Sequence, residues 1–267
     1  MTSDLLTARL FSEAMTLSVA VAIITFNEEA NIRRTLESVC WADEIVIVDS
    51  GSADRTCDIA REFGAKVFVE EWKGFAAQKN SALDKCTRDW VLSLDADEEV
   101  TPELSASIRS ALNEKPDVAY WVNRRNMFCG RWIQYGGFYP DPKLRLFPRG
   151  AGSFANRAVH EDLELIPGKV LSLSLHGDLI HHAYPTLSSY IEHMNRYSSL
   201  GAQIAVSKGH APFSAFNIII RPLATFIYNY FFRLGFLDGR EGLLLHLYHS
   251  VYVSWKYAKA WEKGRYR

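Results

Sequence analysis

Two carboxylates one residue apart, Asp95 and Asp97, stand near the end of the segment VLSLDADEEV (91–100). Residues two apart in an extended chain point to the same side, so both carboxylates could project together, with Ala96 letting the backbone lie close. Two like charges at this separation cost free energy unless a cation or water relieves them. Carboxylate oxygens without a nearby His or Cys favour Mg²⁺ or Mn²⁺, although a solvated turn would also account for the pattern.

Three apolar runs are each followed by polar residues, and the order of the elements predicts where these polar residues meet. Strand patterns cover 17–25, 44–48, 65–69 and 90–94, and helical spacing covers 56–63 and 75–85. Alternating strands and helices form a parallel sheet with right-handed crossovers, and ligands bind beyond the carboxyl ends of its strands. We therefore expect three groups at one sheet edge: Thr25–Glu28, Asp49–Ser52 and Asp95–Asp97.

The loop Asp49–Ser52 allows two interpretations. Ser and Asp cap helices well, so this loop, with Asp54 and Thr56 behind it, could begin the helix over 56–63. A carboxylate can also accept hydrogen bonds from a base imide or from ribose hydroxyls, which would suit a nucleoside better than a bare phosphate. The sequence leaves both interpretations open.

The composition of the 267-residue chain excludes several classes of protein. A hydrophobic fraction of 48% is typical of a sizeable folded core, and a net charge of −1 argues against a general nucleic-acid-binding protein. The four cysteines (Cys40, Cys57, Cys86 and Cys129) form no Cys-x-x-Cys pair and are predicted to be reduced, with buried thiols as the default. The N-terminal residues do not resemble a signal peptide, and no stretch of about 18 apolar residues predicts a spanning helix, so we expect a cytoplasmic protein.

The last third of the chain is rich in aromatic residues and changes in pattern. The segment 130–148 combines Gly, Pro and aromatic residues as irregular binding segments do, and helical spacing then covers 187–206, 213–237 and 243–261. The last two helices mix aromatic with basic side chains, which predicts a region that lies on an anionic membrane surface. A helical hairpin packed on the rest of the chain or on a dimer partner is the alternative.

Four segments together resemble the inverting family 2 glycosyltransferases of the GT-A fold: ITFNEE (24–29), VDSGSADRT (48–56), GFAAQKN (74–80) and LDAD (94–97). Later segments are similar to the bacterial lipopolysaccharide-core transferases of that family: GGFYPDPKLRLF (136–147), AVHEDL (158–163), LIHHAYPTLSSY (179–190) and GFLDGREG (235–242). The resemblance covers nearly the whole chain. It implies an α/β fold of GT-A type, with a Rossmann-like, mostly parallel sheet, helices on both faces and a C-terminal helical extension.

The resemblance also implies a division of the chain. We expect an N-terminal tail over 1–16 and a catalytic domain over 17–210. Within that domain, a nucleotide-binding half would span about 17–115 and an acceptor half about 116–210. An amphipathic helical region that associates with the membrane would follow over 211–267.

The same resemblance implies which residues bind a nucleotide sugar. They are Thr25, Asn27, Glu28, Asp49, Ser52, Asp54, Gln78, Lys79, Asp95, Ala96 and Arg145. Asp49 would face the base, and Asp95 would touch the ribose. Lys79, with Gln78, would close over the base or the ribose. Arg145 would meet a phosphate or the acceptor, unless it forms only a surface salt bridge.

For the metal, the resemblance implies Asp97 as a ligand of Mg²⁺ or Mn²⁺. His181, in preference to His182, would reach the metal or the diphosphate, and a packed or capping histidine is the alternative. A carboxylate must take the proton of the acceptor hydroxyl. Glu161 is the favoured base and Asp162 its alternative, although a charged turn before the strand over 163–166 would explain both residues.

The aromatic segment is assigned to the acceptor through Trp132, Tyr139 and Asp141, although aromatic side chains also fill cores. The function implied is metal-dependent, inverting transfer of a sugar from a nucleotide-diphosphate sugar, with a UDP-sugar favoured, to a saccharide or lipid-linked acceptor. The product would be lipopolysaccharide or another cell-surface glycan. The enzyme would be peripheral on the cytoplasmic face of the inner membrane and would not bind nucleic acid.

Two competing functions stay open at this point. A sugar-phosphate nucleotidyltransferase would need a glycine-rich loop after the first strand, and 25–30 contains no glycine. A non-catalytic, membrane-bound nucleotide-sugar-binding module would not need Asp95, Asp97 and Glu161 together. A dinucleotide dehydrogenase is disfavoured because no G-x-G-x-x-G follows the first strand. The sugar, the acceptor, the linkage and the oligomeric state are not determined by the sequence.

Overall fold

A computed structural model describes residues 17–113, 118–155, 162–167, 171–209 and 213–265. These residues form two compact units, each described by itself. The first unit holds the described residues up to 122, those from 143 to 155 and those from 162 to 178, and the second unit holds the remainder.

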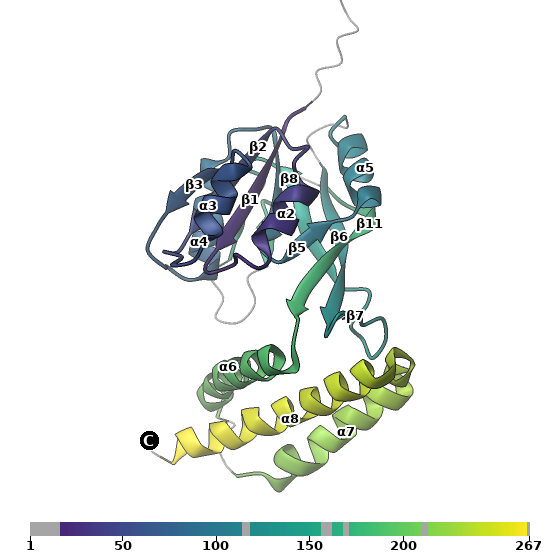
Figure 1. Ribbon diagram of the computed structural model, residues 1–267. Coiled ribbons are helices and arrows are strands. Elements are labelled where there is room, and N and C mark those ends of the chain that lie inside the picture. The colour runs from purple at the N-terminus through teal and green to yellow at the C-terminus, as the bar shows by residue number, and fades with distance from the viewer. Residues whose placement is uncertain (1–16, 114–117, 156–161, 168–170, 210–212, 266–267) are drawn as a thin grey trace, which may run out of the picture. The chain divides into compact units, whose positions relative to one another are not determined.

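A mixed sheet with the strand order β3-β2-β1-β4-β8-β6-β11-β5 forms the basis of the fold (Figure 1). Its strands are β1 (Val19–Thr25), β2 (Glu44–Asp49), β3 (Lys66–Val69), β4 (Trp90–Asp95), β5 (Glu98–Val100), β6 (Val118–Phe128), β8 (Pro142–Pro148) and β11 (Leu171–Tyr184). Strands β3, β2, β1 and β4 are parallel, and β8 runs antiparallel to β4. The register sets Thr25 opposite Asp49 and Ile24 opposite Asp95, so these strands end at one edge, as the sequence predicted.

Helices connect the strands of the first unit. They are α2 (Ile32–Ser38), α3 (Thr56–Glu62), α4 (Phe75–Lys85) and α5 (Pro102–Ala111). A separate two-stranded ladder pairs β9 (Gly152–Phe154) with β10 (Leu163–Leu165).

Strand alternation explains why β1 is buried on both faces. Ala20 and Ala22 belong to a core cluster that includes Ala82 of α4, and these small side chains let the helix approach the sheet closely. Alternation points Val21 and Ile23 to the opposite face, where they are also fully buried. The expected strand over 17–25 therefore forms and is covered on both faces. Burial of each Val or Ile side chain contributes about 1.5–3 kcal/mol.

Strand β5 and helix α5 were not expected from the sequence. Thr101 caps α5 by accepting a hydrogen bond from Leu104 N at 3.3 Å, and Pro102 occupies the first helical position. A Thr cap followed by Pro is a helix start signal, so this helix could have been recognised from Thr101 and Pro102.

The second unit contains three packed helical segments. Helices α6 (Leu187–Ser207) and α8 (Gly239–Gly264) contact each other, and α7 (Arg221–Ile227) runs alongside α8 (Figure 1). The π-helical turns η1 (Phe216–Ile220) and η2 (Tyr228–Phe232) flank α7, and the 3-10 turn η3 (Gly235–Asp238) leads into α8. The short strand β7 (Arg131–Trp132) pairs with β6.

Two expectations about this part of the chain were wrong. A single helix over 213–237 is interrupted, because Leu234 adopts a left-handed φ of 62° and ends the helical run before η3. The segment 130–148 is not irregular throughout, because it contains β7 and all of β8. Strand β8 forms because its buried Leu144 and Leu146 and their neighbours lie beside β4.

Within the described ranges, no helix is both long and apolar enough to cross a membrane. The four cysteines are free thiols, as expected. Only Cys86 is buried, and Cys40 and Cys129 are exposed, so the default of buried thiols was wrong for these two.

The position of the His246 ring in α8 explains why two positions of the C-terminal motifs are glycines. Its buried ring lies against the backbone of Gly136 and of Gly235, where an added Cβ would come within 1.9 Å and 2.3 Å of the ring. Burial lowers the pKa of His246 to about 4, so the ring is neutral. Asp238 fastens the same loop to the start of α8 by accepting hydrogen bonds from the backbone N–H groups of residues 134 and 135.

We expect Gly235→Ala to lower the free energy of unfolding by about 1–3 kcal/mol, because the new methyl group would overlap the His246 ring. The positive-φ penalty does not enter here, since Gly235 has an ordinary backbone conformation. In a His246→Ala background the same substitution should cost less. Urea unfolding of the wild type, the two single variants and the double variant measures how the two substitutions affect each other. If their losses in unfolding free energy simply add, the contact between Gly235 and His246 is contradicted.

Candidate functional site

Asp49 organises the loop at the end of β2. Its fully buried carboxylate accepts hydrogen bonds from Thr25 Oγ1 (2.9 Å), Ser52 Oγ (2.5 Å), Ser52 N (2.8 Å) and Gly51 N (3.0 Å). Burial alone would raise the pKa of Asp49, but the hydrogen bonds from Ser52 and Thr25 outweigh burial and lower it. Asp49 is therefore an ionised group that shapes its own loop, and its contact with a base stays a prediction.

Hydrogen bonds join the loop after β1 to the loop after β2. Asn27 N donates to Ser52 Oγ at 2.8 Å, and the N–H of residue 53 donates to Asn27 Oδ1 at 2.9 Å. Asn27 has a φ of 55°, a left-handed conformation that Asn tolerates better than most residues. Asp54 accepts from Thr56 N at 3.0 Å and so holds the start of α3. The capping interpretation of this loop thus applies to Asp54, and Asn27 joins the two loops.

Negative charge accumulates at this edge of the sheet. Burial raises the pKa of Glu28, and the charges of Asp97, Asp54 and Asp95 raise it further against a hydrogen bond from Asn31. Glu28 and Asp97 are therefore close enough to repel each other. Positive charge brought to this place would be stabilised.

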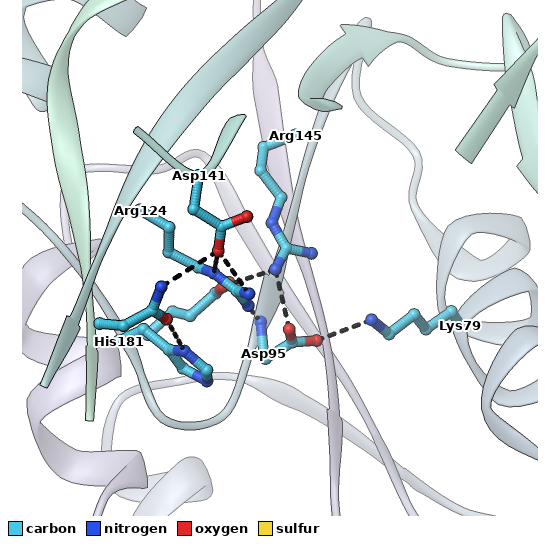
Figure 2. Close-up of polar contacts among 8 residues, drawn as sticks. Lys79, Asp95, Arg124, Asp141, Arg145 and His181 are labelled. Carbon is cyan, nitrogen blue, oxygen red and sulfur yellow. Dashed lines mark hydrogen bonds and ion pairs between the residues drawn. The ribbon is translucent and has the colours of Figure 1, made fainter. Parts of the chain in front are cut away.

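Asp95 is held between two cations (Figure 2). Lys79 Nζ lies 2.8 Å from Asp95 Oδ1, and Arg145 Nη2 lies 2.8 Å from Asp95 Oδ2. The same nitrogen of Arg145 lies 2.5 Å from Glu98 Oε1, and Glu98 Oε2 accepts a hydrogen bond from Asp95 N at 3.0 Å. Helix α4 and strands β4, β5 and β8 each contribute one of these four side chains.

This ion network determines the charge of Asp95. Burial would raise its pKa, but Arg145 and Lys79 hold the pKa well below its ordinary range. Burial also opposes the charge of Arg145, and Asp95 and Glu98 raise the pKa of the guanidinium in return. Arg145 and Glu98 are almost fully buried, whereas 28% of the Asp95 side chain is exposed. A surface salt bridge, the alternative for Arg145, is therefore wrong, and its contact with a phosphate or the acceptor stays a prediction.

Asp97 differs from Asp95 in its surroundings. It lies half-buried in the turn between β4 and β5, beside the acidic Glu28. Among the residues that the structure describes, no three His, Cys, Asp or Glu side chains form a ready metal-binding group. Mg²⁺ and Mn²⁺ at nucleotide sites use one or two carboxylates and take other ligands from phosphates and water. A carboxylate in acidic surroundings fits such an ion, and Asp97 is the residue that would hold it.

Two buried polar groups near these loops have no partner within the described part of the chain. Gln78 of α4 is fully buried, and neither its amide nitrogen nor its amide oxygen is hydrogen-bonded. Ser50, in the loop after β2, buries its hydroxyl in the same way. Such groups cost about 1–3 kcal/mol each, so a ligand that reached them would be stabilised. Ala96 has a structural contact instead, because its carbonyl accepts from Thr35 Oγ1 at 2.7 Å.

A second polar cluster lies in the second unit (Figure 2). Arg124 Nε and Nη2 donate to Asp141 Oδ2 at 2.9 and 2.8 Å, and Asn126 Nδ2 donates to the same oxygen at 3.2 Å. Because the amide nitrogen of Asn126 is used in this way, its Oδ1 accepts from His181 Nδ1 at 2.7 Å. With Nδ1 directed at this oxygen, Nε2 is the ring atom that would bind a metal.

The predicted acceptor aromatics pack against each other. The rings of Trp132 and Tyr139 meet edge to face with centroids 5.2 Å apart, and the Arg125 guanidinium lies 4.7 Å from the Trp132 ring centroid. The Trp132 indole N–H is buried without a partner among the described residues. These contacts explain the packing of the loop, and an acceptor role for Trp132, Tyr139 and Asp141 stays a prediction.

The expected base, Glu161, lies outside the described residues. Asp162 is exposed, and its carbonyl accepts from the N–H of residue 155 at 3.2 Å. His181 and His182 are consecutive in β11, so their side chains point to opposite faces. Only one of the two can therefore face Asn126, and this is His181.

Sequence reasoning missed three residues that the structure places in these clusters. Glu98 follows the Asp-Ala-Asp motif directly, and its acidic side chain at an otherwise buried position was the available signal. Arg124 and Asn126 are two apart in β6, so they share one side of a strand whose earlier residues are apolar. Their polar character within that strand could have marked them.

Comparisons with known proteins identify the family of the chain. The model of the family described as Glycosyl transferase family 2 matches residues 20–162. An uncharacterized glycosyltransferase of Rickettsia typhi is 33% identical over 240 residues, which cover 85% of this chain and 80% of the relative. The lipopolysaccharide core biosynthesis glycosyltransferase LpsC of Rhizobium meliloti is 29% identical over 254 residues, which cover 92% of this chain and 93% of LpsC.

A solved structure extends the comparison to the fold. The mannosyltransferase PcManGT from Pyrobaculum calidifontis, in complex with GDP-Man and Mn²⁺, has a TM-score of 0.50 and 18% identity, covering 92% of this chain and 88% of that protein. At this identity the likeness concerns the fold alone. The expected α/β fold, with a mostly parallel sheet and a C-terminal helical extension, is confirmed.

Arg145→Met should lower the free energy of unfolding by about 3–5 kcal/mol, because the carboxylates of Glu98 and Asp95 would both lose the buried guanidinium that pairs with them. Adding Glu98→Gln in the same chain should recover part of this loss. Arg33→Met is the matched control, since its pair with Glu62 is half-exposed and should contribute less than about 1 kcal/mol. Urea unfolding measures all three variants, and equal losses from Arg145→Met and Arg33→Met would show that the network does not stabilise the fold.

Proposed function

The chain belongs to glycosyltransferase family 2 and has the GT-A fold, and from this premise we propose that it transfers a sugar from a nucleotide-diphosphate sugar to a saccharide or lipid-linked acceptor with inversion. A UDP-sugar is the favoured donor, Mg²⁺ or Mn²⁺ is the cofactor, and lipopolysaccharide or another cell-surface glycan is the product. The reaction would take place at the cytoplasmic face of the inner membrane. The likeness to LpsC, whose name assigns it to lipopolysaccharide core biosynthesis, supports this class of acceptor.

The observation that carries the donor site is the register of β1 with β2 and β4, which gathers Thr25, Asp49 and Asp95 at one sheet edge. Asp49 would meet the base through the loop that it organises. Asp95 is ionised and partly exposed, which suits hydrogen bonds from ribose hydroxyls. From α4, the unpaired amide of Gln78 would close over the nucleoside beside Lys79.

Asp97 would hold the divalent ion, and His181 is the proposed second ligand through Nε2. Burial is the main cause of the raised pKa of Glu28, and the charges of Asp97, Asp54 and Asp95 add to it, so a cation at this place would relieve the repulsion between these carboxylates. A bound divalent ion supplies Lewis-acid and electrostatic stabilisation of the leaving diphosphate.

In the proposed reaction, the acceptor hydroxyl attacks the anomeric carbon from the side opposite the diphosphate. The acceptor oxygen forms the new glycosidic bond, the bond to the diphosphate oxygen breaks, and the hydroxyl proton passes to a carboxylate. Glu161 is the proposed base and Asp162 the alternative. Trp132 and Tyr139 would offer aromatic faces to the acceptor sugar.

Thermal-shift measurements with UDP-, GDP-, dTDP- and CMP-sugars, each with and without Mn²⁺ or Mg²⁺, test the donor site. We expect one nucleotide class to raise Tm in a metal-dependent way, and Asp97→Asn to remove the metal dependence, because the ion would lose its carboxylate. Asp58→Asn is the matched control, since Asp58 is an exposed residue of α3 paired with Arg61 and should leave the response unchanged. No response to any nucleotide would instead favour a non-catalytic binding module.

Glu161→Gln should reduce kcat by at least about 100-fold while the donor-induced rise in Tm persists, because the amide cannot take the proton. Asp162→Asn, one residue away, should keep most of the activity. Sugar-transfer assays, with the anomeric configuration of the product determined by NMR, measure both effects. If Asp162→Asn alone abolishes turnover, the base assignment moves to Asp162, and a product with retained configuration would contradict inversion.

A further inference from the structure

Exposed apolar side chains gather in one segment of the second unit. Of the twenty-five large hydrophobic side chains that are exposed in the described part of the chain, fifteen lie between residues 213 and 247. They extend from η1 through α7, η2 and η3 into the first turns of α8. Phe232 is 74% exposed and Phe216 is 63% exposed. Soluble monomers rarely expose so many neighbouring apolar groups, so this surface requires a partner.

The helical spacing of these side chains places many of them on one side of the run from η1 to η2. We define this side as the apolar face, which consists of Phe216, Ile219, Ile220, Leu223, Ile227, Phe231 and Phe232. Another side of the same run packs on α8, where Ser254 Oγ donates to Ile218 O at 2.8 Å. Pro222 is buried, in contrast to the apolar face. The run therefore has apolar side chains on two sides. One side is packed in the protein, and the other is exposed.

Basic residues accompany the apolar face. Between residues 213 and 265 the chain has seven Lys or Arg and three Asp or Glu, a net charge of +4 in a protein whose total charge is −1. Cations lie over aromatic rings here, with Arg221 5.1 Å from the ring centroid of Tyr257 and Arg265 5.1 Å from that of Trp261. Basic and aromatic side chains together are typical of helices at the level of lipid headgroups.

We propose that the apolar face inserts into the surface of an anionic lipid bilayer, with η1, α7 and η2 lying in the plane of the membrane and the exposed Lys263 and Arg265 against the lipid phosphates. The positive charge of this segment favours an anionic lipid surface over a second copy of the chain as the partner of the apolar face. A twofold interface would bring two segments of charge +4 together, whereas acidic lipids neutralise them. The inference rests on the proposed location at the membrane face and specifies which side chains meet the lipid. The surface belongs to the second unit and involves none of the proposed donor-binding residues.

Vesicle co-sedimentation of the full chain tests the proposal. The probes are vesicles of phosphatidylcholine alone and vesicles with about one third phosphatidylglycerol, at low and at physiological salt. The wild type should bind the anionic vesicles, and more tightly at low salt. Ile219→Ser/Leu223→Ser/Phe232→Ser should weaken this binding by at least about tenfold, because three inserted side chains lose their apolar surface.

Two further variants separate the apolar and the electrostatic contributions. Leu171→Ser/Leu173→Ser removes exposed leucines from β11, outside the apolar face, and should change vesicle binding by less than about twofold. Lys263→Gln/Arg265→Gln should weaken binding to anionic vesicles by about fivefold or more and leave the weaker binding to neutral vesicles unchanged. Unchanged urea unfolding midpoints would show that the substituted proteins are folded.

The proposal is overturned if the wild type ignores anionic vesicles at low salt, or if the β11 variant loses as much binding as the triple variant. It is also overturned if sedimentation velocity without lipid shows a stable dimer that the triple variant converts to a monomer, because a second copy would then cover the apolar face. Donor-induced changes in Tm report on the catalytic proposal separately, so failure of either proposal is distinguishable.

Discussion

The proposed donor site depends on the ion pairs that the buried guanidinium of Arg145 forms. It comes from β8, the antiparallel neighbour of β4, and it meets the carboxylates of Asp95 and Glu98 on either side of the turn that contains Asp97. Without this cation, the buried carboxylate of Glu98 would lose its ion pair with the guanidinium. Arg145 therefore fixes the turn between β4 and β5, and the two aspartates of the motif differ in their contacts. Asp95 has both oxygens in ion pairs, and Asp97 is the carboxylate of the motif that is proposed to hold a metal.

Small residues determine how closely neighbouring elements approach each other within each unit. In the first unit, Ala20, Ala22 and Ala82 let α4 approach β1, and the approach places Lys79 within reach of Asp95. In the second unit, two glycine backbones enclose the ring of His246, and the loop that carries one of them is hydrogen-bonded to the start of α8. In both places the small size of the residues lets neighbouring elements approach closely, and this approach brings the polar groups into contact.

Opposite charges are separated along the chain, although the whole protein is nearly neutral. Carboxylates gather at the edge where β1, β2 and β4 end. Burial raises the pKa of Glu28 there, the neighbouring carboxylates raise it further, and their combined negative charge favours a bound cation. Residues 213–265 carry a net charge of +4 beside exposed apolar side chains, which favours an anionic surface. The two features suit the proposed transfer of a sugar from a nucleotide sugar to an acceptor at a lipid surface.

The sequence by itself determined the elements with strong local signals. Apolar runs and helical spacing identified β1 to β4, α3 and α4 almost to the residue, and the order of strands and helices placed Thr25, Asp49 and Asp95 at one edge. These inferences succeed because local patterning and the shared edge of parallel strands do not depend on distant contacts. The family was likewise readable, because its motifs follow those same strands.

Only the tertiary structure decided which distant side chains meet. Arg145 lies 47 residues from Glu98, and His181 lies 55 residues from Asn126, and no periodicity connects the members of either pair. Their meeting depends on β8 lying antiparallel to β4 in the first unit and on β6 and β11 being neighbours in the sheet order. The break at Leu234 was equally hidden, since leucine rarely adopts a left-handed conformation by its own preference and the local sequence does not mark one. Sequence separation does not encode distance in space, so such pairs and breaks become visible only when the chain is folded.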